Sequence, residues 1–190
     1  MMVQEDSKLL EEFLKGDEQA FESLVCKYKT VVYGTIHSIV GNIQDAEDVS
    51  QEVFLNIYKT LNSFRGQSSL SSWIYRIAVN KSIDNVRKKK NKAISLETEL
   101  DNDEKLKLLD VLSSKEDSDL VVLEKTEFQK TVSKVMNSLP EKFRVILTLK
   151  ELEGLSYDEI SKIMNISVNK VKVWLFRARK KLKKDLALSD

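Results

Sequence analysis

The side chains with the clearest chemistry in this sequence are cations, and they gather in two blocks. Seven basic residues and one acid lie between Arg76 and Lys92, and eight basic residues and no acid lie between Asn165 and Lys184. Dense positive charge favours binding of a polyanion, above all nucleic acid. Lysines also suit helix C-termini, so a pair of solvated helix ends is the alternative. Because each block follows an amphipathic helix, we favour nucleic acid.

The sequence contains few residues suited to catalysis or to metal binding. Cys26 and His37 are each the single residue of their type. The chain therefore offers no disulfide within itself, no cysteine cluster for zinc and no conventional serine–histidine–aspartate triad. The five glycines stand apart from one another, which argues against a glycine-rich phosphate loop. We expect no catalytic residue, no metal, no cofactor and no small-molecule substrate.

Composition indicates the fold class. Five glycines and one proline in 190 residues make about 3%, against roughly 12% in average usage. Sandwiches and barrels need turn residues every 8–12 residues or so, so we predict an all-α protein. The N-terminus lacks a signal-peptide pattern, and no apolar run approaches the ~20 residues that span a bilayer. We expect a protein of a reducing compartment such as the cytoplasm.

An acidic stretch separates two helical regions. Nine acids and three lysines lie between Glu97 and Asp119, in a segment too poorly patterned to build a core. We predict two small helical domains, 1–92 and 120–190, joined by an acidic flexible linker at 93–119. The helix signals of the first domain are Asp17 as an N-cap, Gly41 as a stop, Asp45 at the start of the third helix, and a fourth helix from about Leu70 to Lys90.

The C-terminal segment has the pattern of a helix-turn-helix. Ser156 and Glu159 form an S-x-x-E capping box before a short helix, and Ser167 can cap a longer one from Val168 to about Lys184. At 100° per residue the long helix has an apolar core face, formed by Val168, Val171, Leu175, Ala178 and Leu182. The opposite arc carries Asn169, Lys170, Lys172, Val173, Phe176 and Arg177. That mixture suits a DNA major groove, where apolar groups meet thymine methyls and Arg or Asn meets base edges. Lys180 is expected to contact phosphate.

A second candidate site lies where the loop at 62–69 meets the fourth helix. It combines aromatic, basic and hydroxyl side chains, a set that suits unstacked or single-stranded bases. Its members are Arg65, Ser68, Ser71, Ser72, Trp73, Arg76, Asn80 and Arg87. Trp73 serves equally well as an ordinary core residue, so that alternative stays open.

The predicted third helix has an outer surface suited to a protein partner. Its inner stripe runs from Ala46 to Leu61. On the outer side Leu55 lies among charged and amide residues, namely Asp48, Gln51, Glu52 and Lys59. An exposed leucine in such surroundings fits a binding hot spot, although singly exposed leucines are common.

Four segments of the chain resemble an extracytoplasmic-function (group 4) sigma factor of bacterial RNA polymerase. They are DAEDVSQEVFLNIYKTLNSFRG (45–66), SSWIYRIAVNKSIDNVRKKK (71–90), LPEKFRVILTLKELEGLSYDEISKIM (139–164) and VNKVKVWLFRARKKLKK (168–184). They occur in the family's order and cover nearly the whole chain except the linker.

The resemblance implies a two-domain transcription initiation factor without enzymatic activity. The segment 45–61 would bind the clamp helices of core RNA polymerase, through Asp45, Asp48, Gln51, Glu52 and Leu55. The loop and helix at 62–90 would open and read the −10 promoter element, and the helix-turn-helix would read the −35 element. The linker would thread through the core enzyme. Besides core polymerase and promoter DNA, the resemblance implies an anti-sigma factor, membrane-bound in many relatives, and a role in stress responses.

One segment departs from the family pattern. Family members often read Gly-Thr-Val-Lys/Arg-Ser-Arg where this chain has Asn-Lys-Val-Lys-Val-Trp, at 169–174. DNA binding is compatible with this change, but the −35 sequence that other family members read cannot be carried over to this chain. The rival interpretations are a helix-turn-helix regulator that acts without polymerase and a helical adaptor without nucleic acid. The acidic third helix argues against the first, and the uniformly basic 165–184 against the second.

Overall fold

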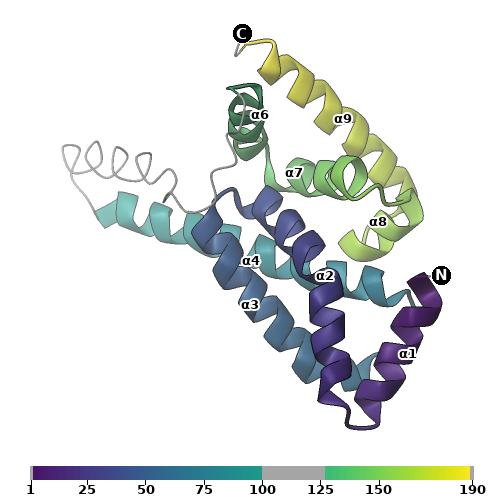
Figure 1. Ribbon diagram of the computed structural model, residues 1–190. Helices are drawn as coiled ribbons and strands as arrows, with labels where there is room; N and C mark the ends of the chain where they lie inside the picture. The colour runs from purple at the N-terminus through teal and green to yellow at the C-terminus, as the bar shows by residue number, and fades with distance from the viewer. Residues whose placement is uncertain (1, 100–126, 189–190) are drawn as a thin grey trace.

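The structure is a computed structural model that describes residues 2–99 and 127–188, with side chains from 5 to 92 and from 130 to 188. Throughout these ranges the regular elements are helices, which confirms the predicted all-α class. Figure 1 shows a group of N-terminal helices and a group of C-terminal helices that lie against each other.

The N-terminal half folds into α1 (Met2–Leu14), α2 (Glu18–Val40), α3 (Ile43–Thr60), the short 3-10 turn η1 (Leu61–Ser63) and α4 (Leu70–Glu99). Asp17 caps α2 as predicted, because its carboxylate accepts the Gln19 N–H at 2.9 Å. Gly41 ends α2 in the left-handed conformation with φ 89°. The inner stripe of α3 is buried among α2 and α4, as its helical spacing predicts.

The start of α3 differs from the prediction. Asn42, rather than Asp45, is the N-cap: its side-chain oxygen accepts the Asp45 N–H at 2.9 Å. The Asn42 amide in turn donates to the Asp45 carboxylate at 2.6 Å. Asp45 therefore lies in the first turn, where a carboxylate is favourable near the helix N-terminus. Both residue types are good caps, so the sequence left the choice between them open.

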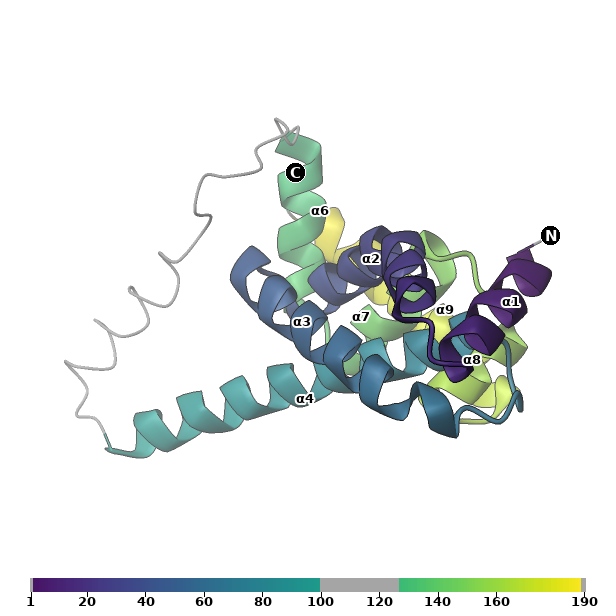
Figure 2. The same ribbon diagram turned by 60° about the horizontal axis from the view of Figure 1, so that its bottom comes forward.

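The helix α4 is longer than predicted. It continues through Glu99 instead of ending near Lys90, so the first seven residues of the predicted linker are helical. Residues 93–99 include Ala, Leu and two Glu, which favour helix continuation. Figure 2 shows the C-terminal part of α4 projecting beyond the bundle. The rest of the predicted linker, 100–119, lies outside the described residues.

The C-terminal half consists of α6 (Glu127–Ser138), α7 (Glu141–Leu147), the π-helical turn η2 (Thr148–Leu152), α8 (Tyr157–Met164) and α9 (Val168–Leu186). Its caps are those that the sequence predicts. Ser156 and Glu159 form the capping box before α8, and the Ser167 hydroxyl accepts the Lys170 N–H at 3.3 Å before α9. Short helix, tight turn and long helix make the predicted helix-turn-helix.

The π-helical turn has no counterpart in the sequence prediction. Its last hydrogen bond runs from the Glu153 N–H to the Thr148 carbonyl at 3.1 Å, five residues back rather than four. One extra residue in a turn rotates the side chains that follow by about 100° relative to an uninterrupted α-helix. Glu153 directly follows this turn, and its carboxylate lies 2.8 Å from the Tyr75 and the Thr35 hydroxyls.

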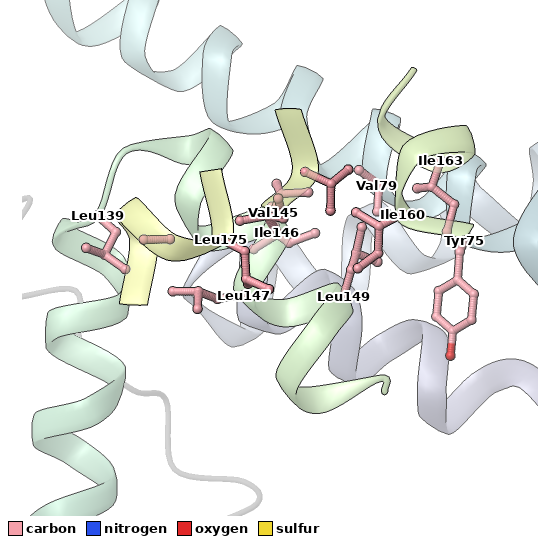
Figure 3. Packing of buried hydrophobic residues seen from close by; sticks show 13 residues of the cluster. Tyr75, Val79, Leu139, Val145, Ile146, Leu147, Leu149, Ile160, Ile163 and Leu175 are labelled. Carbon is pink, nitrogen blue, oxygen red and sulfur yellow. The ribbon is translucent and has the colours of Figure 1, made fainter. Parts of the chain in front are cut away.

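The two halves share one hydrophobic cluster. Ile39 from α2 and Tyr75 and Val79 from α4 are buried together with side chains of the C-terminal helices. Figure 3 shows Tyr75 and Val79 beside Ile160 and Ile163 of α8. Full burial of one such aliphatic side chain contributes ~1.5–3 kcal/mol, so the cluster stabilises the contact between the halves.

A second contact between the halves forms at the end of α2. The Asn137 side-chain amide donates to the Gly41 carbonyl at 3.3 Å, and the buried Arg144 guanidinium donates to the Asn137 side-chain oxygen at 3.3 Å. A Cβ at Gly41 would lie 2.5 Å from that oxygen. Gly41 thus needs to lack a side chain both for its left-handed φ and for this close approach.

The Gly41 contact yields a test of how the halves pack. Gly41→Ala should destabilise the chain by ~2–4 kcal/mol, because it combines left-handed strain with a steric clash. Asn137→Ala removes the clash, so in the double variant we expect ~0.5–3 kcal/mol of coupling, measured by denaturant unfolding. Gly16→Ala is the control: Gly16 has φ 95° and no atom within 4 Å of the added Cβ. Strictly additive losses for Gly41 and Asn137 would mean that the halves do not touch there in solution.

Candidate nucleic-acid and polymerase interfaces

The long helix α9 presents one face to the core and another to solvent. Val171, Leu175 and Ala178 are buried, whereas Val168 and Leu182 are half-buried. All the side chains predicted to face DNA are exposed: Asn169, Lys170, Lys172, Val173, Phe176, Arg177 and Lys180. Phe176 is 70% exposed, an unusual position for a large aromatic side chain. The predicted division of α9 into two faces is therefore confirmed.

The start of α9 is held in place by its neighbours. Asn165 has left-handed φ 52° and ends α8, which lets the chain turn sharply into Ser167 and α9. The Lys142 ammonium of α7 lies 5.2 Å from the centre of the Trp174 ring on α9, within cation–π range. Hydrogen bonds from Ser156 lower the pKa of Glu159, so this carboxylate stays ionised in its capping box. These contacts fix the direction from which α9 would enter a groove.

The loop before α4 lines a pocket of about 430 Å³. Two aromatic side chains, Phe64 and Trp73, lie side by side in it with ring centres 5.5 Å apart. Arg65 and Arg76 contribute positive charge, together with Lys162 of α8. The other lining residues are Ser63, Gln67, Ser68, Ser72, Ile163 and Asn165. An aromatic pair flanked by cations is suited to a flat base with its phosphate.

The sequence reasoning missed one wall of this pocket. Lys162, Ile163 and Asn165 come from the helix-turn-helix, about ninety residues further along the chain. No local sequence pattern predicts a contact between two domains. Only the packing of the domains brings these side chains to the loop. The remaining predicted members lie along α4, where Arg76 and Asn80 are exposed.

Three predicted members of this site have structural partners of their own. Ser72 is buried, and the Ser69 hydroxyl bonds it twice at the start of α4: it accepts the Ser72 N–H at 3.2 Å and lies 2.8 Å from the Ser72 hydroxyl. Ser71 lies 3.1 Å from the same oxygen. Arg87 forms two hydrogen bonds with Glu141 of α7, at 3.1 and 3.3 Å.

Trp73 occupies both of the environments that the sequence left open, a position in the core and a position in the candidate base-binding site. It is half-buried and packs against the core of the N-terminal half, and it also lines the pocket. Its ring is therefore held in place by the core while remaining accessible on one side.

The outer surface of α3 is exposed as predicted. Leu55 is 59% exposed, and Asp48, Gln51 and Glu52 are exposed around it. Tyr58, which the sequence analysis did not single out, extends the apolar part of this surface and lies edge-on to Phe21 at 5.0 Å. Its i,i+3 spacing from Leu55 is the signal that points to it.

Asp45 does not share the exposure of the other four residues. Its side chain is buried, is bonded to Asn42 and forms an ion pair with Lys89 of α4 at 2.5 Å. These contacts occupy the carboxylate in joining α3 to α4. The predicted contact of Asp45 with polymerase would have to replace these bonds, whereas Asp48, Gln51, Glu52 and Leu55 are exposed.

Fold and surfaces together define a helix-turn-helix DNA-binding protein with a second, aromatic-lined site. Family models agree: "Sigma-70 region 2" matches residues 24–92 and "Sigma-70, region 4" matches residues 129–182. The RNA polymerase sigma-H factor of Pseudomonas aeruginosa is 35% identical over 98% of this chain and 96% of its own length. The ECF RNA polymerase sigma factor SigW of Bacillus subtilis is 36% identical over 94% and 95%. The ECF RNA polymerase sigma-E factor of Escherichia coli K12 is 38% identical over 92% and 90%.

Solved structures share the fold. CnrH in complex with the cytosolic domain of CnrY has a TM-score of 0.69 at 22% identity, covering 98% of this chain and 99% of that one. The sigma factor RpoE in complex with the anti-sigma factor NepR from Bartonella quintana has a TM-score of 0.67 at 19% identity, covering 90% and 98%.

The chain belongs to the extracytoplasmic-function family of RNA polymerase sigma factors. It is thus a transcription initiation factor, and members of this family direct polymerase to promoters without catalysing a reaction themselves. Within the described residues, no helix is both long and apolar enough to cross a membrane. The same part of the chain holds no group of three or more metal-ligating side chains.

The α3 surface is tested by Leu55→Arg. This change places a charge at the centre of the exposed face and leaves the buried stripe intact, so we expect lost co-elution with core polymerase and an unchanged thermal melt. Leu14→Arg is the matched control, because Leu14 is 52% exposed on α1. Core binding at wild-type affinity by the Leu55 variant would remove this face from the interface.

The α9 surface is tested by comparing Arg177→Ala with Lys180→Ala. Loss of a base contact should cost ~1–3 kcal/mol and relax the preference at one base pair, whereas loss of a phosphate contact weakens all sequences alike and lowers the salt slope by about 1. Footprinting with holoenzyme over a salt series separates the two effects. Identical, sequence-independent losses would show that Arg177 contacts phosphate only.

Proposed function

We propose that three exposed surfaces divide the work of promoter recognition among three helices. The outer face of α3 binds core polymerase, the Trp73 pocket and the exposed side of α4 open and read the −10 element, and α9 reads the −35 element. The observation that carries this proposal is the pocket, where an aromatic pair lies among cations at the start of α4. The corresponding domains would be 1–92 and 120–190, with the intervening 93–119 as a linker.

Charge explains the proposed role of α9, and stacking explains the proposed role of the Trp73 pocket. The Arg and Lys side chains of α9 supply long-range attraction to phosphate, while Phe176 and Val173 add apolar contact at base edges. At the pocket, unstacking a base costs a few kcal/mol, and stacking it on an aromatic ring returns ~1–3 kcal/mol. Melting of the promoter DNA then becomes favourable once polymerase binding supplies the rest of the free energy needed for unstacking.

We also propose that an anti-sigma factor regulates this protein. RpoE, which has the same fold, is described in complex with the anti-sigma factor NepR. A partner of this kind would hold the protein inactive in the bacterial cytoplasm, or at the membrane if the partner is itself membrane-bound. Pull-down from cells of the source bacterium, followed by expression of the captured protein with this chain, tests this assignment.

Run-off transcription tests the proposed melting role. Core polymerase supplemented with this protein should produce discrete transcripts from a genomic-fragment library. With Trp73→Ala we expect promoter occupancy to persist but permanganate reactivity of the −10 thymines to be largely lost. A template with a pre-melted bubble should restore much of the transcription, because the energetic cost of unstacking has already been met.

The control for this test is Ile77→Ala. Ile77 packs against the same core as Trp73 but does not line the pocket. Both substitutions should lower the melting temperature, whereas only Trp73→Ala should impair opening. If the two variants open promoters equally well, Trp73 is a core residue and the pocket does not capture a base.

A further inference from the structure

The helix α1 is joined to α2 through a buried carboxylate. Asp6 is 8% exposed, and its Oδ2 accepts a hydrogen bond from the Tyr28 phenol of α2 at 2.7 Å. Its Oδ1 forms an ion pair with the Lys27 ammonium at 2.8 Å, and Lys27 also pairs with Glu5 at 2.8 Å. The region 2 family match begins at residue 24, so it does not include α1. The role of α1 therefore has to be inferred from its contacts.

The Tyr28 phenol also contacts the first turn of α4, because its oxygen interacts with the Ser71 hydroxyl through a hydrogen bond. Burial and the bond to Asp6 raise the pKa of this phenol, so it keeps its proton and remains a donor to Asp6. A phenol can donate one hydrogen bond and accept another at the same time. Tyr28 thus connects α1 with the start of α4.

Ser71 belongs to a group of hydroxyls at the start of α4. The Ser69 hydroxyl lies 3.1 Å from that of Ser71 and 2.8 Å from that of Ser72, and it accepts the Ser72 N–H at 3.2 Å. The Ser69 carbonyl accepts the Trp73 N–H at 3.1 Å. This is the bonding pattern of a helix N-cap. The backbone of Trp73 is therefore bonded to the residue that caps its helix.

The hydrogen bonds of Ser71 and Tyr28 run toward one charge. Ser71 donates to Tyr28 and Tyr28 donates to the Asp6 carboxylate, whose charge Lys27 balances. Hydrogen bonds in such a chain strengthen one another, and a charged acceptor makes the last one stronger. Removal of the phenol or of the carboxylate should therefore loosen the cap of α4, while the apolar core stays in place.

We propose that Asp6 and Tyr28 are positioning residues for promoter opening, because their hydrogen bonds to Ser71 hold the first turn of α4 and thereby Trp73. The inference rests on the capture of an unstacked base at the Trp73 pocket, proposed above. Neither Asp6 nor Tyr28 lines that pocket, so both act through the cap of α4 and not by touching DNA. A ring that is already fixed loses little freedom when a base stacks on it. Opening of the promoter should therefore depend on this chain of hydrogen bonds more than its occupancy does.

The test is Tyr28→Phe in holoenzyme assembled with core polymerase. Phenylalanine keeps the buried ring and removes the hydroxyl that bonds both Asp6 and Ser71. We expect unchanged core binding and promoter occupancy, but a ~10-fold loss of permanganate reactivity at the −10 thymines, as for one hydrogen bond to a charged acceptor. A template with a pre-melted bubble should restore transcription.

Two changes at Asp6 test the same chain from its other end. Asp6→Ala should reproduce the loss of opening, and it replaces Tyr28→Phe if that variant does not fold. Asp6→Asn retains an acceptor oxygen and should recover part of the loss. Because both residues act through one chain, Asp6→Ala combined with Tyr28→Phe should impair opening no more than either change alone.

Ser82→Ala is the matched control. Ser82 is a buried hydroxyl of the same helix, but it donates to the Ala78 carbonyl at 2.8 Å. This variant should lose thermal stability and open promoters as the wild type does. Wild-type opening by Tyr28→Phe and Asp6→Ala would overturn the inference. An equal loss with Ser82→Ala, or a loss that the pre-melted bubble does not restore, would overturn it as well.

The same assay separates this inference from the proposed function on which it rests. If Trp73→Ala impairs opening while Tyr28→Phe does not, base capture stands and only the positioning role of Asp6 and Tyr28 fails. If Trp73→Ala opens promoters normally, base capture itself fails.

Discussion

The arrangement of the whole molecule depends on α4, whose side chains face three environments. Ile74 and Ala78 pack in the core of the N-terminal half, while Tyr75 and Val79 pack against the C-terminal helices. Arg76 and Asn80 remain exposed. Because the helical repeat places neighbouring residues about 100° apart, one stretch of seven residues supports one core, contacts the other and leaves Arg76 and Asn80 exposed to solvent.

Through this shared use of α4 the two halves meet, while the N-terminal half keeps a core of its own. The N-terminal core does not need the C-terminal helices, since α2, α3 and α4 enclose their own buried residues. Ile39, Tyr75 and Val79 add a limited apolar contact, and polar bonds from Glu153 and Asn137 complete it. Interfaces between domains of one chain are commonly of this mixed kind and allow relative motion.

Much of the fold follows from local signals in the sequence. The capping box at Ser156 and Glu159, the cap at Ser167 and the two faces of α9 are all found where periodicity and cap chemistry place them. The errors have local causes as well. Asn42 and Asp45 are equally good caps, and the helix-favouring residues after Lys90 extend α4 into a segment whose charge suggested a linker.

The sequence could not predict the side-chain contacts that form where the two halves pack against each other. Lys162 and Asn165 reach the Trp73 pocket, and Glu153 reaches Tyr75 and Thr35, only because tertiary packing brings distant segments together. The π-helical turn before Glu153 has no recognised sequence signature. Burial of Asp45 likewise depends on Lys89, which comes from another helix. Candidate residues on one helix face were thus predictable, and their partners across elements were not.

The central claim is that α4 joins two halves that lie against each other in the free protein, and that reading two promoter elements, as proposed, draws these halves apart. The most direct measurement is the distance between spin labels on Ser23→Cys and Ser133→Cys, both at exposed positions in opposite halves, with Cys26 replaced by Ser. We predict one narrow distance distribution in the free protein and a shift by tens of ångströms in the promoter-bound holoenzyme, because elements centred near −35 and −10 lie about 25 base pairs apart, or ~85 Å along B-DNA at 3.4 Å per base pair. The same distribution in both states would contradict the account.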